Sequence, residues 1–246
     1  MTSMTIIDQL LVLLDDEHPH SLEEMTTTVA QRSKQTVSST LGRLIAKGWV
    51  VREARQGRGQ YRTTTTGRNY VTDFLDQIKS MSHARWDGSW EQVIFNIPER
   101  DRKRRDDLRA LLVRLGYGRL HGWLWISPWS HRVEVEQYIT TTRSEREVTI
   151  LRTGPLDQVT NQRVGRLFEW DWAALEAAYA DYMQHAEQFL KQKKKDPYEA
   201  RCIVYQYAKV LATDPKLPAI LPTHVLNSTK AFALYERIRP FCYEVK

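Results

Sequence analysis

The stretch that most limits what this chain can fold into is "WDGSWEQVIFNIPERDRKRRDDLRALLVRLGYGRLHGWLWISPW", residues 86–129. Val93, Phe95 and Ile97 alternate with other residues, as in a strand with one buried face, and Pro98 ends that strand. Leucines at helical spacing then predict a helix, and the apolar run after "HG" predicts a hairpin.

The residues after this hairpin supply a further helix and strand. "WSHRVEVEQYITT" is typical of a helix and "REVTILRTG" of a last strand. The order β-α-β-β-α-β predicts a ferredoxin-like domain over residues 86–155. That fold has many functions, so it indicates none by itself. Trp123 and Trp125 favour a core or a dimer seam over a ligand site, because their strand is apolar on both faces.

Helices and a hairpin are predicted before this domain, over residues 1–80. In the second helix, Ser21 and Glu24 have the spacing of a capping box. The third helix, "SKQTVSSTLGRLIAKG", has a capping residue at Ser33 and a C-terminal stop at Gly48. Its expected inward residues are Val37, Leu41, Leu44 and Ile45.

The opposite side and the flanks of the third helix have side chains of the kinds that can contact DNA. They carry Gln35, Ser38, Ser39, Gly42 and Arg43, and they lack acidic residues. Short polar groups and one arginine suit base edges and phosphates in a major groove, whereas a merely solvated face more often carries Glu and Lys.

The stretch "GWVVREARQGRGQYRTTTTG" predicts a hairpin with a basic tip, which after a helix-turn-helix is a wing. Arg55, Arg58 and Arg62 are expected to contact phosphates or an adjacent minor groove. The alternative is a winged helix that makes only protein contacts. The helix "GRNYVTDFLDQIK" closes the domain, and residues 80–85 form a linker.

Charge supports a DNA partner only because of its distribution. The net charge of the 246-residue chain is +6. Residues 31–68 contain nine Lys and Arg against one acid, Glu53, while residues 1–30 contain acids and no Lys or Arg. A local positive field attracts a polyanion.

The other compositional signals predict an ordinary cytoplasmic protein. Cys202 and Cys242 lack C-x-x-C spacing and are expected to be free thiols. The N-terminus does not have the pattern of a signal peptide, and no apolar run approaches a membrane span. No enzyme motif is present, so no cofactor, metal or membrane partner is expected.

The last third, residues 165–246, is predicted to be helical, which makes the whole chain α+β. "FEWDWAALEAAYADYMQHAEQFLKQKKK", "YEARCIVYQYAKVLA" and "NSTKAFALYERIR" are three amphipathic segments. Asn227 or Ser228 is expected to cap the last one. A contribution to effector binding and dimer formation is expected here.

The stretch "SWEQVIFNIPERDRKRRDDLRALLVRLGYGRLHGWLWISP" resembles the signature of the PaaX family, the phenylacetic-acid catabolon repressors. That family has W-x-x-V-x-F-D-I-P-E, an Arg-rich helix, L-G-F-G and V-W-I-S-P. The winged helix before it and "DPKLPAILP" after it agree in order, so the resemblance spans essentially the whole chain. It implies a ligand-responsive repressor that binds operators as a dimer. It also implies a middle domain similar to the small subunit of the CRISPR integration complex, some relatives of which are described as metal-dependent nucleases.

Two departures from this pattern affect what the resemblance implies. The family's Asp at the strand end is Asn96 here, a neutral and weaker ligand for Mg²⁺, while Asp101 and Asp106 stand among arginines as expected surface ion pairs. This favours a scaffold over a nuclease. Where relatives have H-E-Y-R, this chain has Tyr205-Gln206-Tyr207-Ala208, and Val225 stands where relatives have Trp.

We therefore expect a dimeric DNA-binding repressor that a small-molecule effector releases from its operator. The family's best-known effectors are aryl acyl-CoA thioesters, so an acyl-CoA of a catabolic pathway is a candidate effector, with Tyr205 and Tyr207 as candidate effector contacts. The alternatives are a metal-dependent nuclease and a protein-interaction adaptor.

Overall fold

The chain divides into two compact units, and each unit is built from segments that are separate in the sequence. The computed structural model describes residues 4–15, 18–29, 33–55, 58–79, 85–221 and 227–242. Unit 1 contains the N-terminal segment and most of the C-terminal helices, residues 1–81, 177–211 and 227–246. Unit 2 contains residues 82–176 and 212–226. The chain thus leaves unit 1 and returns to it.

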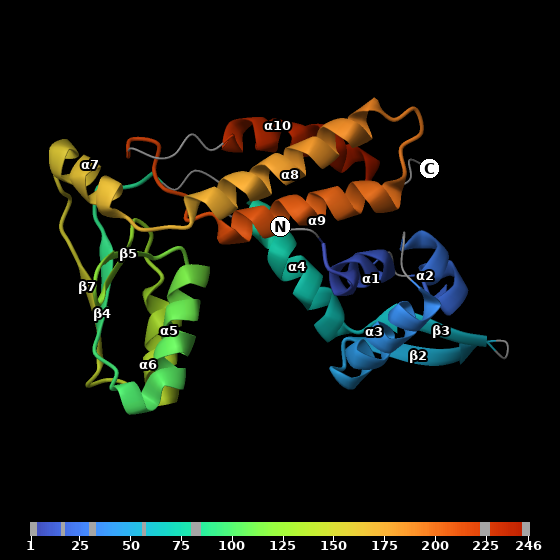
Figure 1. Cartoon of the computed structure of the whole chain (residues 1–246), viewed down its shortest axis with the longest axis horizontal. Helices are drawn as coiled ribbons and strands as arrows, with labels where there is room; N and C mark the ends of the chain where they lie inside the picture. Colours follow the sequence, from blue (N-terminus) through green and yellow to red (C-terminus); the bar gives the residue numbers. More distant parts are fainter. Residues whose placement is uncertain are drawn as a thin grey trace. The chain divides into compact units, whose positions relative to one another are not determined.

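The N-terminal part of unit 1 is a winged helix (Figure 1). Its sheet has the order β1-β3-β2, and β2 and β3 form the predicted hairpin. The two-residue strand β1 pairs with β3 and was not predicted. Its elements are α1 (Ile6–Leu14), β1 (His20–Ser21), α2 (Leu22–Thr28), α3 (Lys34–Ala46), β2 (Val50–Arg55), β3 (Arg58–Thr63) and α4 (Thr65–Lys79).

Side-chain caps fix where the first helices begin. The predicted capping box of α2 is confirmed, because the Ser21 backbone N–H donates to Glu24 at 2.7 Å and the Glu24 N–H donates to the Ser21 hydroxyl at 3.2 Å. A second box, Thr5 with Asp8, begins α1. The threonine run after Tyr61 was expected in the return strand, but β3 ends at Thr63 and the following threonines open α4.

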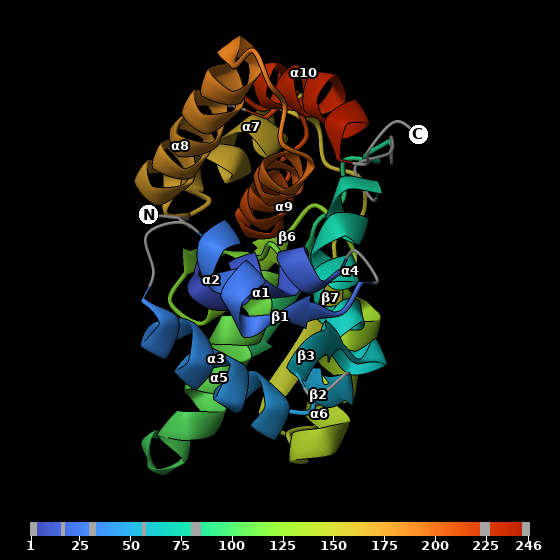
Figure 2. The ribbon, with the colours of Figure 1, turned by 90° about the vertical axis from the view of Figure 1, so that its right-hand side faces the viewer.

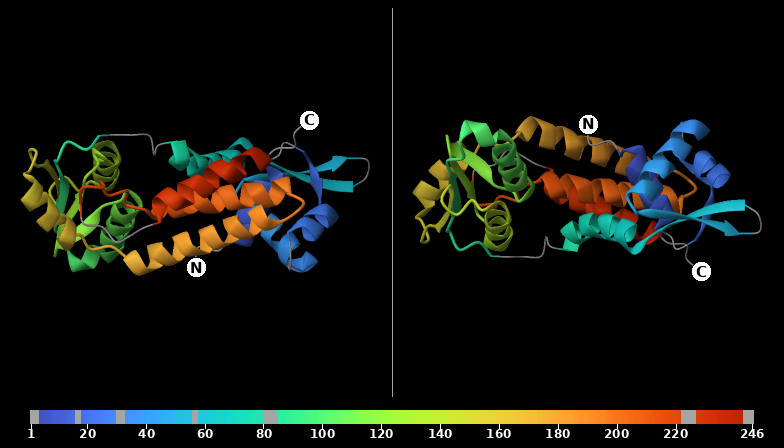
Figure 3. Two further views of the ribbon diagram at one scale, coloured as in Figure 1. Left: turned by 90° about the horizontal axis from the view of Figure 1, so that it is seen from above. Right: turned by 90° about the horizontal axis from the view of Figure 1, so that it is seen from below.

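The C-terminal helices complete unit 1 and lie alongside one another (Figure 3). They are α8 (Trp172–Lys191), α9 (Pro197–Thr213), α10 (Ser228–Ile238) and the 3-10 helix η2 (Arg239–Phe241), with the start of α8 and the end of α9 in unit 2. Asn227 is the N-cap residue of α10, but its side chain makes no capping bond. Tyr205 of α9 is part of the winged-helix core, and the Tyr198 hydroxyl donates to the Gln9 carbonyl at 3.2 Å. In Figure 2, α9 lies above α1 and α2.

Unit 2 confirms the predicted ferredoxin-like order β-α-β-β-α-β. The sheet has the order β5-β6-β4-β7, and all its pairs are antiparallel. An additional helix, α7, follows the last strand and was not predicted. The elements are β4 (Glu91–Phe95), the 3-10 helix η1 (Glu99–Asp101), α5 (Arg102–Arg114), β5 (Gly118–His121), β6 (Leu124–Ser127), α6 (Arg132–Thr142), β7 (Val148–Arg152) and α7 (Gln158–Leu167).

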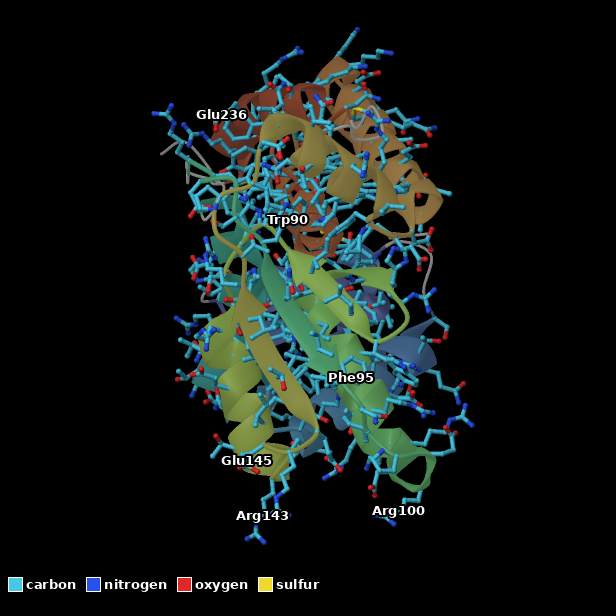
Figure 4. All side chains as sticks on the ribbon, turned by 90° about the vertical axis from the view of Figure 1, so that its left-hand side faces the viewer. Trp90, Phe95, Arg100, Arg143, Glu145 and Glu236 are labelled. Carbon is cyan, nitrogen blue, oxygen red and sulfur yellow. The ribbon has the colours of Figure 1, made fainter. Side chains whose placement is uncertain are left out.

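The two faces of this sheet are covered differently. On one face, Val93, Phe95 and Trp125 pack against leucines of α5 and Val135 of α6. The other face is buried near Trp90 by Phe168, which follows α7. Figure 4 labels Trp90 and Phe95, which lie near opposite ends of β4. Further along this second face, apolar side chains remain exposed, among them Ile94 (39% exposed) and Leu151 (47%).

Candidate nucleic-acid interface

The helix α3 is held on its inner side by the winged-helix core. Ser33 caps its N-terminus by accepting a bond from the Thr36 backbone N–H at 3.2 Å. Val37, Leu41 and Leu44 are fully or almost fully buried, as predicted. Ile45 was expected to face inward and is 38% exposed. Thr40, three residues after Val37, is buried on this face instead. The helix has 3.6 residues per turn, which places Ile45 at the edge of the buried face.

The outer face of α3 presents the predicted contact residues together. Gln35, Ser38, Ser39 and Arg43 are all exposed. The Ser39 hydroxyl donates to the Thr36 carbonyl at 3.1 Å, and Arg43 Nη2 donates to the buried Thr40 hydroxyl at 3.0 Å. Both bonds lie within α3. The guanidinium of Arg43 carries five N–H donors, so its bond to Thr40 leaves several of them available.

The wing places two of its predicted arginines at the ends of its strands. Arg55 and Arg58 are register partners where β2 ends and β3 begins. Their side chains, with residues 56 and 57 between them, lie outside the described part. Arg62 was expected to be available for contact with DNA. In the structure its guanidinium forms an ion pair with the Glu53 carboxylate at 2.7 Å. Both side chains are about half exposed, so this pair reduces the positive charge on that side of the wing.

Arg52 is a basic residue of the wing that is not among the predicted DNA contacts. Its guanidinium lies 5.9 Å from the centre of the Tyr61 ring. It also covers Gly59, where an added Cβ would stand 2.6 Å from Arg52 Nε. Arg52 is opposite Tyr61 in the strand register, and the alternation of side chains along β2 is the sequence signal for this position.

In unit 2, the position that bears on nuclease chemistry is Asn96. It is exposed just after β4, and its backbone N–H donates to the Glu147 carbonyl at 2.8 Å. Asp101 and Asp106 are surface ion-pair partners as predicted, at 3.7 Å from Arg100 and 3.5 Å from Arg102. Among the described residues, no group of three or more His, Cys, Asp or Glu side chains is placed to hold a metal ion.

The two candidate effector residues on α9 have different surroundings. Tyr207 is fully buried and stacks on Tyr182 and Tyr235, with ring centres at 4.9 Å and 5.4 Å. Tyr205 is 1% exposed and contacts Phe74 edge-to-face, with ring centres 5.4 Å apart. Tyr205 also lines a cavity of unit 1, whereas Tyr207 is not among the residues that line it.

Comparisons with known proteins agree with this arrangement. Residues 83–164 match the PaaX protein central Cas2-like domain, and residues 9–115 match the penicillinase repressor family. The uncharacterized protein Rv0674 from Mycobacterium tuberculosis has a similar structure, with a TM-score of 0.62 and 20% sequence identity over 97% of this chain and 96% of that one. No curated protein sequence matches the chain.

None of the described helices is long and apolar enough to cross a membrane. The matches place a repressor-type winged helix directly before a Cas2-like domain. The chain thus has a repressor-type winged helix and a central domain similar to that of PaaX proteins, and these domains support a DNA-binding transcriptional regulator.

Proposed function

We propose that this regulator represses transcription in the cytoplasm by placing α3 in the major groove of operator DNA. The observation that carries the proposal is the outer face of α3, which is exposed, rich in short polar groups and free of carboxylates. Such a face meets base edges without charge repulsion from the phosphates. The proposed contacts from α3 are Gln35, Ser38, Ser39 and Arg43.

The wing supplies the backbone contacts in this proposal. Arg55 and Arg58 stand at the tip-side ends of their strands and reach phosphates or the adjacent minor groove. Arg62 joins them when its bond with Glu53 opens, which costs little because both side chains are half exposed. DNA binding therefore rests on a helix for base contacts and a hairpin for backbone contacts.

The regulator acts as a dimer in this proposal. A two-fold symmetric protein reads an inverted repeat, with one recognition helix in each half-site. The exposed apolar residues on the sheet of unit 2, Ile94 and Leu151, support a contact with a second copy. In the strand register Ile94 is opposite Thr149 and Leu151 is opposite Gln92, so both lie on the same sheet face.

A small-molecule effector releases the operator. An acyl-CoA thioester of a catabolic pathway is the candidate, in line with the PaaX-type central domain. Release requires only that the effector bind the DNA-free conformation more tightly than the DNA-bound one.

A salt titration of operator binding tests the interface and the dimer together. Each neutralised phosphate contributes about 0.9 to the slope of log affinity against log salt. Arg58→Ala removes one contact per protomer, so a dimer loses about 1.8 units of slope on its native promoter. Arg146→Ala, an exposed arginine of unit 2, is the control and keeps the slope. An unchanged slope in Arg58→Ala removes Arg58 from the interface, and one protomer per site removes the dimer.

The rival function, a metal-dependent nuclease on unit 2, is separated by a cleavage assay. Single- and double-stranded substrates are incubated with the purified protein and Mg²⁺ or Mn²⁺. The scaffold interpretation predicts no cleavage, because the neutral side chain of Asn96 is a weak ligand for a hard cation. Cleavage that Asn96→Ala abolishes would establish the nuclease.

A further inference from the structure

The wing has two different sides, which the alternation of side chains along β2 and β3 separates. Val50 of β2 packs in the same core cluster as Leu41 of α3, and its register partner Thr63 is also buried. Arg52 and its register partner Tyr61 are each two residues further toward the tip, so they project from this same side. This side, defined by Val50, Arg52, Tyr61 and Thr63, is the helix side of the wing.

The opposite side of the wing carries Glu53 and Arg62, which neutralise each other. Arg62 must break this ion pair before its guanidinium can bond a phosphate. The situation on the helix side is different. Arg52 is exposed, and its contacts in the described part of the chain are with the Tyr61 ring and with Gly59 rather than with a carboxylate. Its positive charge therefore lies, without a counter-charge, on the side of the wing that faces the core of α3.

Two neighbours fix the position of the Arg52 guanidinium. It lies 5.9 Å from the centre of the Tyr61 ring, within the reach of about 6 Å of a cation–π attraction. Ala54 and Gly59 are register partners one step nearer the tip on the same side, and both are small.

Gly59 leaves the space that the guanidinium occupies. An added Cβ at Gly59 would stand 2.6 Å from Arg52 Nε and 2.8 Å from Arg52 Nη2. The guanidinium thus takes the place that a side chain at this position would fill. An arginine that is held in one place before binding loses less conformational entropy when it meets its partner.

We propose that Arg52 is a preorganised contact of the wing with DNA, and that Gly59 is the positioning residue that leaves room for its guanidinium. This inference rests on the proposed function and adds to it a contact from the strands of the wing. A guanidinium can bond a phosphate in a bidentate manner, and it can also enter a narrow minor groove.

Two substitutions test the contact by different routes. Fluorescence anisotropy measures the affinity for a labelled duplex from the native promoter. Arg52→Ala removes the cation and is expected to weaken binding about tenfold. Gly59→Ala keeps every charge and displaces only the far end of the Arg52 side chain, and it is expected to weaken binding about threefold. Unchanged affinity in Arg52→Ala overturns the contact, and unchanged affinity in Gly59→Ala overturns the positioning role.

The double variant shows whether Gly59 acts through Arg52. In the Arg52→Ala background, Gly59→Ala should cause no further loss of affinity, because no guanidinium remains to be displaced. Additive losses would show that Gly59 has a separate role in the wing. Should Gly59→Ala fail to fold, Arg52→Lys replaces it, because lysine keeps the charge but lacks the planar fork.

Two substitutions in unit 2 serve as matched controls. Arg146→Ala removes an exposed arginine, and Gly154→Ala adds a methyl group where no atom lies within 4 Å. Both are expected to keep the wild-type affinity. Thermal unfolding of all variants at the wild-type midpoint would assign the losses of affinity to the interface with DNA.

Random DNA identifies the acceptor of the Arg52 bonds. A phosphate contact predicts equal losses on promoter and random DNA, with a salt slope lower by about 0.9 per protomer. A contact in the minor groove predicts a larger loss on the promoter. If the wild-type protein binds no promoter DNA, the proposed function fails together with this contact. If it binds, and Arg52→Ala binds equally well, the contact alone fails.

Discussion

At the residue scale, the carboxylate of Asp8 is 1% exposed and receives bonds from separate parts of unit 1. The Thr5 backbone N–H and hydroxyl donate to it at 2.9 Å and 2.7 Å, which begins α1. Lys209 of α9 donates from its ammonium at 2.7 Å. A buried carboxylate is stable only with such partners, so this ion pair fixes α9 against α1.

Removal of the cation leaves this carboxylate buried and poorly compensated. We expect Lys209→Met to lower the free energy of unfolding by about 3 kcal/mol, at the lower end for buried pairs, because the lysine side chain is 19% exposed. The double variant Asp8→Asn/Lys209→Met should recover part of that loss. Urea denaturation of the four proteins measures the coupling. Strict additivity of the two single changes would show that the pair contributes nothing to stability.

Arg43 is the one guanidinium on the outer face of α3. If it contacts a guanine, Arg43→Ala weakens binding to the operator by about 1–3 kcal/mol and leaves binding to random DNA nearly unchanged. Fluorescence anisotropy on both DNAs at one salt concentration measures the difference. Equal loss on the two DNAs would assign Arg43 to a phosphate.

At the scale of elements, the start of α4 is tied closely to the end of α3. The Thr64 backbone N–H donates to the Trp49 carbonyl at 2.9 Å, and the Thr64 hydroxyl donates to the Gly48 carbonyl at 2.7 Å. The Trp49 and Tyr70 rings stack with centres 4.6 Å apart. An added Cβ at Gly67 would stand only 2.1 Å from the Trp49 carbonyl oxygen, so glycine is required for this approach.

Two helical glycines therefore respond oppositely to the same substitution. Gly42→Ala on α3 meets no atom within 4 Å and should raise the free energy of unfolding by about 0.5–1 kcal/mol, since alanine favours helix. Gly67→Ala should lower it by about 2 kcal/mol or more, because the methyl group forces α4 from Trp49. Thermal unfolding of both variants checks the signs. Stabilisation by Gly67→Ala would contradict the close approach.

At the scale of the whole molecule, the two units differ in the number of tryptophans that can report their unfolding and in the ionisable groups that they bury. Trp49 is the single tryptophan of unit 1, and the other seven of the eight lie in unit 2. Tryptophan fluorescence therefore follows unit 2. In that unit, Glu91 is buried and receives bonds from the Tyr117 hydroxyl, the Ser130 hydroxyl at 2.7 Å and the His131 backbone N–H at 2.8 Å.

The stability of unit 2 should depend on the protonation of His131. Burial lowers the pKa of its imidazole below the ordinary 6.5, with Lys216 adding to the effect and Glu134 and Glu91 opposing it. The unfolded chain then binds more protons than the folded one. This contribution to stability is fully present above pH 6.5 and is lost as the pH falls toward the folded pKa.

We expect His131→Phe to remove part of this pH dependence while keeping a ring near Tyr117, whose centre is 6.0 Å from the imidazole. Urea unfolding between pH 7 and pH 5, followed by tryptophan fluorescence, should show a smaller loss of stability in the variant than in the wild type. Equal losses of stability in both proteins would show that the pKa of His131 is the same in the folded and unfolded states.

The sequence by itself determined the features that depend on neighbours along the chain. The capping box of Ser21 and Glu24, the outer face of α3 and the β-α-β-β-α-β order all follow from local spacing, and each has the expected structure. Spacing was less reliable at the edge of a stripe, where Ile45 is exposed and Thr40 is buried. Helical periodicity indicates which side is buried, and its margins depend on the surface that packs there.

Only the tertiary structure decided which parts of the chain share a core. Tyr205 and Asp8 are 197 residues apart, and nothing local in either segment indicates their hydrogen bond. An amphipathic pattern shows that α9 must bury one face but does not specify the partner, because apolar burial is not directional. The return of α9 onto α1 makes the winged helix and the C-terminal helices one unit, and it creates the cavity beside Tyr205.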